Sequence, residues 1–332
     1  MRRLAIIGGG GWGTALAIIL SPRFSDVSLW VYEQDLAERM RSARENDLYL
    51  PGLRLPDKIR IVTDFREALQ SAEVVLSATP SHVVRAVCSE MLSWLDPSML
   101  FVSATKGLEN NTLLRISEVI REVVSARFAP RVAALSGPTF APEVARGEPT
   151  ALVISSTDAL LAETIQLAFS SPTFRVYTNQ DPVGVEMGAA LKNVIAIGAG
   201  VCRGLGLGSN IIAALITRGL VEITRLAVAL GGRPATLAGL AGLGDLVLTC
   251  TGELSRNRMV GIELGRGRKL ADILASMRMV AEGIRTTDAA VELARKYQVD
   301  LPITEQMYRV LYQGLSPREA IRELMERSLR GE

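Results

Sequence analysis

The pattern of apolar and polar positions changes near Asn179. Before it, short apolar runs alternate with segments whose apolar residues recur at helical spacing. This alternation predicts parallel strands joined by crossover helices on both faces of a sheet. We expect strands at Leu4–Ile7, Val27–Val31, Ile59–Val62, Val74–Ala78, Leu100–Ala104, Val132–Leu135, Leu152–Ser155 and Phe174–Thr178. We expect helices at Gly13–Leu20, Asp35–Arg44, Phe65–Gln70, Ser81–Leu95, Leu113–Ser125 and Asp158–Phe169.

Beyond Asn179 the pattern is helical throughout. Asp181-Pro182 is typical of a helix start, because proline fits the first turn. A helix from about Val183 to Val201 should follow, and another should run from Ser209-Asn210 to Leu230. Later helices are expected at Arg256–Leu264, Leu270–Met277, Arg285–Tyr297, Thr304–Leu311 and Pro317–Arg327. The fold class predicted is therefore α/β then all-α, with one domain over residues 1–180 and a helical domain over residues 181–332.

The first strand runs into a glycine-rich turn and then a helix. Gly8, Gly10 and Gly13 have the G-x-G-x-x-G spacing of a dinucleotide-binding turn. Gly8 permits the turn, Gly10 lets the backbone approach a pyrophosphate, and Gly13 lets the helix pack close to the strand. Glu33 ends the second strand, where an acid accepts hydrogen bonds from the adenosine ribose. A turn without a ligand is the alternative, but the context favours NAD(H) or NADP(H) bound to a Rossmann-type doubly wound sheet.

Composition narrows the class of partner. The 332 residues are 48% hydrophobic and 22% charged, with a net charge of +2, as in a soluble globular protein. This balance offers no electrostatic reason to expect nucleic acid or an anionic membrane as partner. Basic residues followed by an apolar run at the start of the chain could open a signal peptide, but the glycine-rich residues 8–13 interrupt that apolar run. Gly188–Val201 is too short and too polar to span a bilayer. We therefore expect a cytoplasmic protein with no membrane span.

The histidine and cysteine counts exclude several kinds of site. His82 is the single histidine, so a site with two His ligands cannot form. Cys88, Cys202 and Cys250 are odd in number and widely spaced. That pattern disfavours a disulfide framework or a cysteine metal site, and it suits a reducing compartment. We expect no metal.

Two lysines and one aspartate are candidates for chemistry. Lys192 lies among small and apolar residues, and a desolvated lysine has a lowered pKa that suits proton transfer near neutrality. Lys106 follows the fifth expected strand, at the edge where open α/β sheets bind ligands. Asp245 lies among apolar residues and needs a cationic partner. A catalytic cluster and a structural Lys–Asp pair that joins the domains both fit this spacing.

Two further segments have alternative interpretations. His82 follows the fourth expected strand and could face a cofactor, but we favour a structural role at a helix start. The Tyr-x-x-x-Lys spacing of another dehydrogenase class does not occur. Ser255, Arg256 and Asn257 begin a helix after a loop, an arrangement that suits a phosphate group. The alternative is a capped surface helix with solvated arginines.

The ordered blocks of the chain resemble one family nearly end to end. They are Gly8–Ala17, Asn46 with Tyr49-Leu50-Pro51, Pro80-Ser81-His82, Ala104–Glu109, Ser136–Ala141, Lys192–Gly200, Ala241–Thr251, Ser255–Arg258 and Val280–Gly283. Together these blocks resemble the bacterial NAD(P)-dependent sn-glycerol-3-phosphate dehydrogenases. The resemblance implies reversible hydride transfer between NAD(P)H and dihydroxyacetone phosphate, which gives sn-glycerol 3-phosphate for glycerophospholipid synthesis. It also implies a homodimer.

The resemblance assigns roles to individual residues. Lys192 matches the family's proton acceptor, and we expect Lys106 and Asp245 to poise it in a cleft between the domains. The substrate-binding positions matched are Lys106, Gly137, Thr139, Lys192, Asp245, Ser255, Arg256 and Asn257. The cofactor-binding positions matched are Trp12, Lys106, Ala141, Arg256, Val280 and Glu282, and we add the turn residues Gly8, Gly10, Gly11 and Gly13 together with Glu33.

The chain departs from the family pattern at two positions. Gly11 stands where relatives often have serine, which removes one possible hydroxyl contact to the pyrophosphate. Tyr32 stands where many relatives carry a basic residue near the adenosine 2′ position. With Glu33 beside it, this substitution weakens the case for strict NADPH use without deciding the preference.

Two other functions remain open from the sequence. One is a dehydrogenase for another small acid or phosphate on a similar two-domain plan. The other is a regulator that binds NAD(P)H without turnover. Rates with phosphorylated and unphosphorylated hydroxyketones separate the first from the glycerol-3-phosphate enzyme, and tight cofactor binding without NADH oxidation would favour the second.

Overall fold

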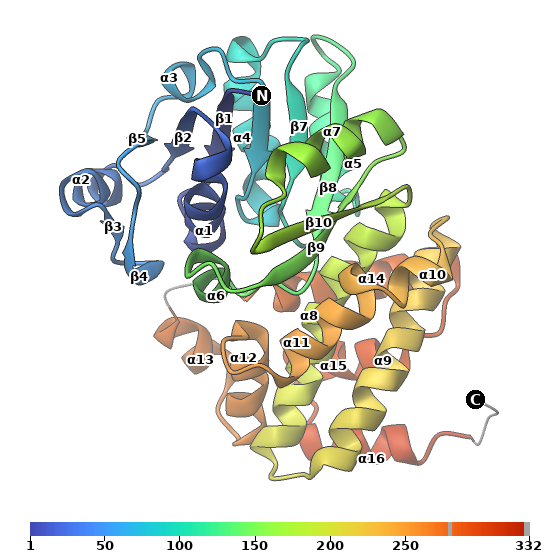
Figure 1. Ribbon diagram of the computed structural model, residues 1–332. Coiled ribbons are helices and arrows are strands. Elements are labelled where there is room, and N and C mark those ends of the chain that lie inside the picture. Colours follow the sequence, from blue (N-terminus) through green and yellow to red (C-terminus); the bar gives the residue numbers. More distant parts are fainter. Residues whose placement is uncertain (278–280, 329–332) are drawn as a thin grey trace.

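The structure is a computed structural model in which residues 1–277 and 281–328 are described. A sheet with helices forms the N-terminal part, and helices alone form the C-terminal part (Figure 1). The change falls between β10 (Phe174–Asn179) and α8 (Pro182–Gly204), close to the expected boundary. The fold class predicted from the sequence is confirmed. The division into two domains at residue 180 stays a prediction.

The sheet contains eight strands in the order β10-β9-β8-β7-β6-β1-β2-β5. The remaining strands are β1 (Arg3–Ile7), β2 (Asp26–Trp30), β5 (Ile59–Val62), β6 (Val74–Ser77), β7 (Leu100–Ser103), β8 (Arg131–Ser136) and β9 (Thr150–Ser155). Their positions match the apolar runs. β1 is buried on both faces, because Leu4 and Ile6 belong to one core cluster while Ala5 and Ile7 belong to the other. This arrangement is what makes such strands continuously apolar.

The expectation of parallel strands throughout is wrong at one point. β8 and β9 are antiparallel, and β10 runs parallel to β9, so the last two strands are reversed relative to the other six. The link from β8 to β9 contains a single five-residue helix, α6 (Ala141–Ala145), which packs against α1. A parallel crossover usually returns along the sheet on a full α-helix, and this link has no helix of that length. Apolar runs show that a strand exists but not its direction.

The helices of the sheet part lie close to their expected positions. They are α1 (Gly11–Leu20), α2 (Gln34–Ala43), α3 (Phe65–Leu69), α4 (Val84–Met91), α5 (Ile116–Val124) and α7 (Ala159–Phe169), with 3₁₀ turns η1 (Ser21–Arg23), η2 (Ser81–Val83) and η3 (Leu92–Trp94). A separate hairpin of β3 (Glu45–Asn46) and β4 (Leu50–Arg54) was not predicted. β3 has two residues and β4 contains Pro51-Gly52, so neither has an alternating apolar pattern.

The helical part is built around α8 (Figure 1). Its other helices are α9 (Ser209–Ala229), α10 (Pro234–Leu237), the π-helical turn η4 (Leu240–Gly244), α11 (Asp245–Thr251), α12 (Arg256–Gly265), α13 (Leu270–Ser276), α14 (Glu282–Tyr297), α15 (Pro302–Tyr312) and α16 (Pro317–Met325). The sequence did not predict α10, η4 or α11. In the described residues, α8 alone is long and apolar enough to cross a bilayer, and that apolar stretch is wholly buried inside the protein. It is therefore a core helix.

Small residues let α12 lie directly against α8. A Cβ at Gly200 would stand 2.0 Å from the carbonyl oxygen of Arg258, and one at Gly261 would stand 2.0 Å from that of Ile197. No real Cβ contact is that short, so the two backbones touch where only glycine fits. This close packing fixes the direction of α8, and with it the position of Lys192.

Candidate active site

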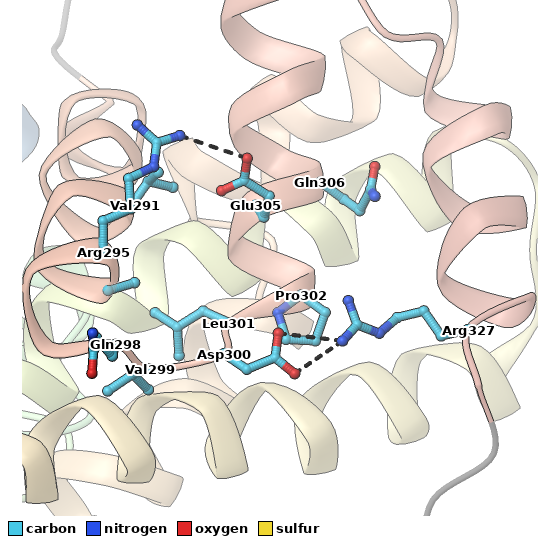
Figure 2. A pocket seen from close by; sticks show the side chains of 11 residues that line it. Val291, Arg295, Gln298, Val299, Asp300, Leu301, Pro302, Glu305, Gln306 and Arg327 are labelled. Carbon is cyan, nitrogen blue, oxygen red and sulfur yellow. Dashed lines mark hydrogen bonds and ion pairs between the residues drawn. The ribbon is translucent and has the colours of Figure 1, made fainter.

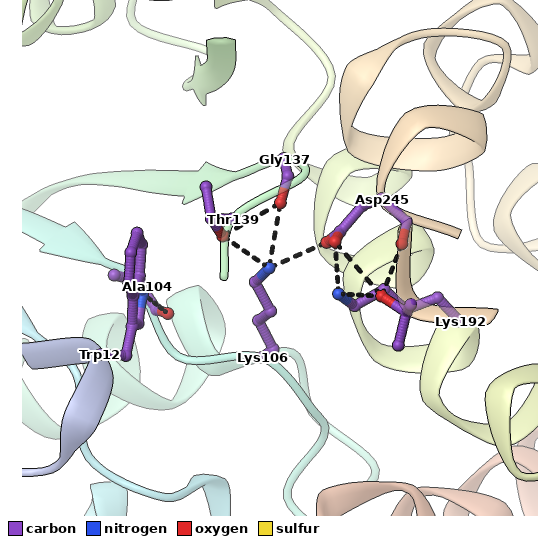
Figure 3. A network of polar contacts seen from close by, with 8 residues as sticks. Trp12, Ala104, Lys106, Gly137, Thr139, Lys192 and Asp245 are labelled. Atoms are coloured by element: carbon purple, nitrogen blue, oxygen red, sulfur yellow. Dashed lines mark hydrogen bonds and ion pairs between the residues drawn. The ribbon is translucent and has the colours of Figure 1, made fainter. Parts of the chain in front are cut away.

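The two candidate lysines and the candidate aspartate form one network (Figure 3). The Lys192 ammonium donates to Oδ1 of Asp245 at 2.5 Å, and the Lys106 ammonium donates to Oδ2 at 2.9 Å. Lys106 follows β7 in the sheet part, whereas Lys192 lies on α8 and Asp245 begins α11 in the helical part. The carboxylate therefore joins the two parts of the protein and holds two cations close together.

Burial controls the ionisation of Lys192. The residue is 5% exposed, Asp245 is fully buried, and the Lys106 side chain is 17% exposed. The pKa of Lys192 is lowered to about 7, because removal of the ammonium from water lowers it most, the Asp245 carboxylate raises it, and the Lys106 charge lowers it. A lysine with such a pKa is present in both protonation states near neutral pH, as a proton donor and acceptor requires.

The loop after β8 completes the surroundings of Lys106. The ammonium also donates to the carbonyl oxygen of Gly137 and to the hydroxyl oxygen of Thr139, each at 3.1 Å (Figure 3). Gly137 has φ +151°, and a Cβ there would stand 2.8 Å from Leu152. Only glycine therefore fits the turn that presents this carbonyl to Lys106. The expected substrate positions 106, 137 and 139 do lie together.

Thr249 is a member of this network that the sequence analysis missed. Its hydroxyl accepts from Lys192 at 2.9 Å and donates to the Asp245 carbonyl at 2.6 Å. It lies four residues after Asp245 on α11, so both face the same side of the helix. Recognising α11 as a helix would have identified it. The turn η4, which leads directly into α11, lies close against α8, since a Cβ at Gly188 would stand only 2.7 Å from the Ala241 carbonyl oxygen.

The glycine turn has the shape that a pyrophosphate requires. Gly8 has φ +124°, and a Cβ at Gly13 would stand 1.9 Å from the Gly8 carbonyl oxygen. A Cβ at Gly10 would meet nothing within 4 Å, so open space lies beside the backbone there. Gly10 is the N-cap of α1, and because it has no side chain it does not cap the N–H groups of the first turn. The N–H groups of that turn and the helix dipole suit an anion, so these residues fit a dinucleotide cofactor.

Other expected cofactor residues surround this turn. Trp12 Nε1 donates to the Ala104 carbonyl at 3.1 Å, which ties α1 to the end of β7 (Figure 3). Ala141 begins α6, the helix that packs against α1. A Cβ at Gly11 would stand 2.7 Å from the carbonyl oxygen of Tyr49. A serine at position 11 would therefore displace the β3–β4 hairpin, which explains physically why glycine stands there.

Glu33 lies at the N-cap of α2, three residues after the end of β2 at Trp30. One of its carboxylate oxygens, Oε1, accepts from the Tyr49 hydroxyl at 2.8 Å. The pKa of Tyr49 is raised to about 12, first by burial and then by the hydrogen bond to the Glu33 carboxylate, so the phenol stays a donor at physiological pH. The sequence analysis did not foresee this contact, because the hairpin that carries Tyr49 was not predicted.

The segment Ser255-Arg256-Asn257 starts α12 as expected. The Ser255 hydroxyl caps the helix by accepting from the backbone N–H of Arg258 at 3.3 Å. The side-chain oxygen of Asn257 accepts from the backbone N–H of Gly283 at 2.9 Å, which leaves its NH₂ as the group that can donate to an anion. Asn257 is thus also a structural link between α12 and α14.

Glu282 and His82 lie near the same boundary between sheet and helices. Glu282 begins α14, and its carboxylate accepts from the Ser81 hydroxyl at 2.7 Å and from the Ser81 N–H at 3.3 Å. His82 is on η2, is exposed, and does not belong to the Lys192 network. Val280, the remaining expected cofactor residue, lies outside the described residues.

Two cavities lie in the helical part, away from the Lys192 network. One of about 420 Å³ lies between α14 and α15 and contains two ion pairs, Arg295 with Glu305 and Arg327 with Asp300 (Figure 2). Another of about 650 Å³ lies along α9. Neither shares a residue with the Lys192 network. Within residues 1–277 and 281–328, no group of three or more His, Cys, Asp or Glu side chains is placed to hold a metal ion.

Comparison with known proteins identifies the family. Residues 3–162 match the model of the NAD-dependent glycerol-3-phosphate dehydrogenase N-terminus, and residues 181–322 match that of the C-terminus. The chain belongs to the NAD(P)-dependent glycerol-3-phosphate dehydrogenase family. It is an oxidoreductase, so the regulator without turnover is not supported. The resemblance noted from the sequence is confirmed.

Individual relatives match this dehydrogenase over its whole length. A glycerol-3-phosphate dehydrogenase [NAD(P)+] from Koribacter versatilis (strain Ellin345) is 60% identical over 329 residues, which cover 98% of both chains. The crystal structure of glycerol-3-phosphate dehydrogenase from Coxiella burnetii has a TM-score of 0.94 at 38% identity and covers 98% of this chain and 99% of that one. The enzyme from Saccharomyces cerevisiae has a TM-score of 0.82 at 26% identity, with coverages of 98% and 99%.

Proposed function

We propose that this dehydrogenase reversibly reduces dihydroxyacetone phosphate to sn-glycerol 3-phosphate, with Lys192 as the proton donor and acceptor. The observation that carries this proposal is the Lys192–Asp245–Lys106 network. It combines a buried ammonium whose pKa is lowered to about 7 with a second cation at the carboxyl end of β7. Open α/β sheets bind their ligands at that edge.

Each member of the network has a part in this mechanism. A nicotinamide cofactor held at the glycine turn supplies the hydride when bound. Lys192 donates its proton to the carbonyl oxygen of the substrate in the reducing direction, and it takes that proton back in the oxidising direction. Asp245 holds the Lys192 ammonium in place through Oδ1. Lys106 adds positive charge beside the oxygen on which negative charge develops, where an oriented cation is effective.

We propose that the start of α12 binds the substrate phosphate. The first-turn N–H groups, the Arg256 guanidinium and the Asn257 NH₂ are donors suited to a phosphate. Gly137 and Thr139 join Lys106 on the sheet side of the substrate. For the cofactor we propose the turn residues Gly8, Gly10, Gly11 and Gly13, with Trp12, Glu33, Lys106, Ala141, Arg256, Val280 and Glu282.

Substrate selectivity tests this function directly. NADH and NADPH consumption is measured with dihydroxyacetone phosphate and, in parallel, with unphosphorylated dihydroxyacetone. We expect kcat/KM to be at least roughly 10²-fold higher for the phosphate ester, since charge-assisted hydrogen bonds are lost without it. In Arg256→Ala this advantage should shrink, mainly through a higher KM for the phosphate ester. Equal rates with both ketones would reject the proposed substrate, and an unchanged KM in Arg256→Ala would reject the proposed phosphate-binding site at the start of α12.

The cellular setting is part of the same proposal. We infer a cytoplasmic homodimer, with the substrate bound in a cleft between two domains, that supplies sn-glycerol 3-phosphate for glycerophospholipid synthesis. The buried core position of α8 supports a water-soluble protein. Light scattering of the purified protein during gel filtration tests the dimer, and a mass near the 35.8 kDa of one chain would reject it.

A further inference from the structure

Glu33 is positioned beside the glycine turn by a network of fixed contacts. β1 and β2 are parallel neighbours with Ile7 opposite Trp30, so the turn after β1 and Glu33 after β2 lie at the same edge of the sheet. Tyr49 binds Oε1 of Glu33 and thereby leaves Oε2 as an acceptor. The carboxylate is therefore held in a defined position rather than left to move on the surface.

The β3–β4 hairpin is hydrogen-bonded to the glycine turn, and this contact also fixes the position of Tyr49. Asn46 is fully buried, and its NH₂ donates to the Gly9 carbonyl and to the Thr14 hydroxyl, each at 2.8 Å. Its oxygen accepts from the Tyr49 N–H at 3.0 Å. The backbone of Tyr49 also touches the turn at Gly11. Turn, hairpin and carboxylate thus form one unit.

The charged residues next to Glu33 in sequence are acidic. Residues 32–38 contain Glu33, Asp35 and Glu38 and no basic side chain, and Tyr32 is neutral and 77% exposed. The next basic residue along the chain, Arg39, is bound to Asp35 at 3.1 Å and to Asp47 at 3.1 Å. A carboxylate accepts hydrogen bonds from ribose hydroxyls, whereas a 2′-phosphate needs a cation such as arginine.

We propose that Glu33, oriented by Tyr49, makes this dehydrogenase prefer NAD(H) to NADP(H). The free oxygen of Glu33 accepts from the adenosine 2′-hydroxyl, and its charge repels a 2′-phosphate at the same place. Glu33 is the specificity-determining residue and Tyr49 is a positioning residue. This inference rests on the proposed binding of a dinucleotide at the glycine turn, but it does not depend on Lys192 or on the identity of the substrate.

Calorimetric titration of the full-length protein with NADH and with NADPH, without substrate, tests the preference. We expect the Kd for NADH to be lower by about tenfold or more. In Glu33→Gln the Kd for NADPH should fall and that for NADH should rise slightly, so that the ratio of the two approaches one. Equal Kd values in the unmodified protein would overturn the proposal, as would a ratio that Glu33→Gln leaves unchanged.

Asp35→Asn is the matched control, because it also removes one negative charge, at a position two residues from Glu33. The Asp35 side chain is 81% exposed. In Asp35→Asn the ratio of the Kd values for NADPH and NADH should stay within about twofold of that of the unmodified protein, as expected for a screened surface charge. An effect equal to that of Glu33→Gln would mean that overall charge, not Glu33, sets the preference.

Tyr49→Phe tests the positioning role, since the ring stays and the hydroxyl is lost. We expect the Kd for NADH to rise about threefold, as for loss of one oriented hydrogen bond. A NADH Kd that does not change would remove Tyr49 from the proposal. Binding of neither nucleotide would overturn this inference together with the proposed function. A clear preference for NADH combined with no turnover of dihydroxyacetone phosphate would support this inference and reject the proposed substrate.

Discussion

Lys192 is an ammonium group that the fold has removed from water and placed between opposing charges. Burial and Lys106 favour the neutral amine, whereas Asp245 favours the cation. Burial is the largest effect, so the pKa of Lys192 falls to about 7 although a carboxylate lies 2.5 Å away. Because Asp245 gives one oxygen to each lysine, neither cation has the full compensation of an isolated ion pair. This balance is the physical basis of the proposed chemistry.

Lys192→Met removes the proposed proton donor and keeps most of the side-chain volume. We expect kcat for reduction of dihydroxyacetone phosphate to fall by roughly 10²–10⁴-fold, the usual effect of losing a general acid. The Kd for NADH should hardly change. Steady-state kinetics and titration measure the two quantities, with Lys296→Met, at an exposed position on α14, as the control. A Lys192→Met protein that retains most of its kcat would exclude Lys192 from the mechanism.

The pH dependence should have opposite signs in the two directions. In the proposed mechanism reduction requires protonated Lys192, so kcat should fall as the pH rises through about 7. Oxidation requires the neutral amine, so kcat should fall as the pH drops through the same value. In Lys106→Met the pKa of Lys192 should be higher, because a cation that lowers it is gone. Initial rates between about pH 5.5 and 9 test this, and flat profiles in both directions would contradict it.

The glycine turn shows how one element combines packing with binding. Gly13 lies on α1 against the Gly8 carbonyl, so its missing side chain lets the helix approach β1. Gly10 faces open space, so its missing side chain matters for a ligand and not for folding. The same residue type in one motif therefore has two separable physical roles, which a matched pair of alanine variants can distinguish.

Gly13→Ala should destabilise the protein, because its Cβ would stand 1.9 Å from a backbone oxygen. We expect a loss of about 1–3 kcal/mol in the free energy of unfolding, typical of overpacking. Gly10→Ala should change the free energy of unfolding by less than about 0.5 kcal/mol, since the backbone at Gly10 is extended and the added Cβ would have no atom within 4 Å. It should nevertheless weaken NADH binding. Urea denaturation and titration measure both effects, and equal stabilities of the two variants would refute this assignment.

The elements that the sequence predicted are those with a strong local pattern. The eight expected strands are all present, and the long helices α8 and α9 start and end within a few residues of their expected limits. The elements that were missed are short: β3, β4, α6, α10, η4 and α11. A segment of two to seven residues contains too few apolar positions to define a period. Long-range contacts hold such segments in place, as Asn46 holds the hairpin.

The sheet part and the helical part are joined by buried polar contacts rather than by apolar packing alone. Glu186 on α8 accepts from Arg115 Nη1 at 2.7 Å and from the N–H of Ser117 at 2.8 Å, both at the start of α5. Glu282 accepts from Ser81 at another point of the same boundary. Hydrogen bonds of this kind are directional, so they fix how the two lysines of the site face each other.

Glu186→Ala should destabilise the whole molecule, because it leaves the largely buried Arg115 without one of its two carboxylate partners. We expect a loss of about 3 kcal/mol in the free energy of unfolding, as for other broken buried ion pairs. Glu148→Ala breaks an exposed ion pair with Arg146 and should change the free energy of unfolding by less than about 1 kcal/mol. Chemical denaturation of both variants checks this, and similar losses would show that Glu186 is not a buried anchor.

The chemistry of the candidate site was visible in the sequence, but its assembly was not. Lys192 and Asp245 stood out because each is charged within an apolar setting. Lys106 stood out because it follows a strand at the edge where open α/β sheets bind ligands, and the glycine spacing marked the cofactor turn. Thr249, Ser81 and Tyr49 did not stand out, because a hydroxyl carries no such signal in a linear sequence. Their contacts depend on which segments meet: Ser81 and Glu282 are 201 positions apart.

Local patterns were enough to establish the strands, the long helices, the dinucleotide turn and the family of this dehydrogenase, because periodicity and motif spacing reside in neighbouring residues. They could not establish that β9 and β10 run backwards, that Tyr49 holds Glu33, or that one carboxylate serves two lysines 53 and 139 positions away. Those features follow from packing between distant segments. In particular, the close contacts of α8 with α11 and α12 bring Lys192 to Asp245, and burial there changes its pKa.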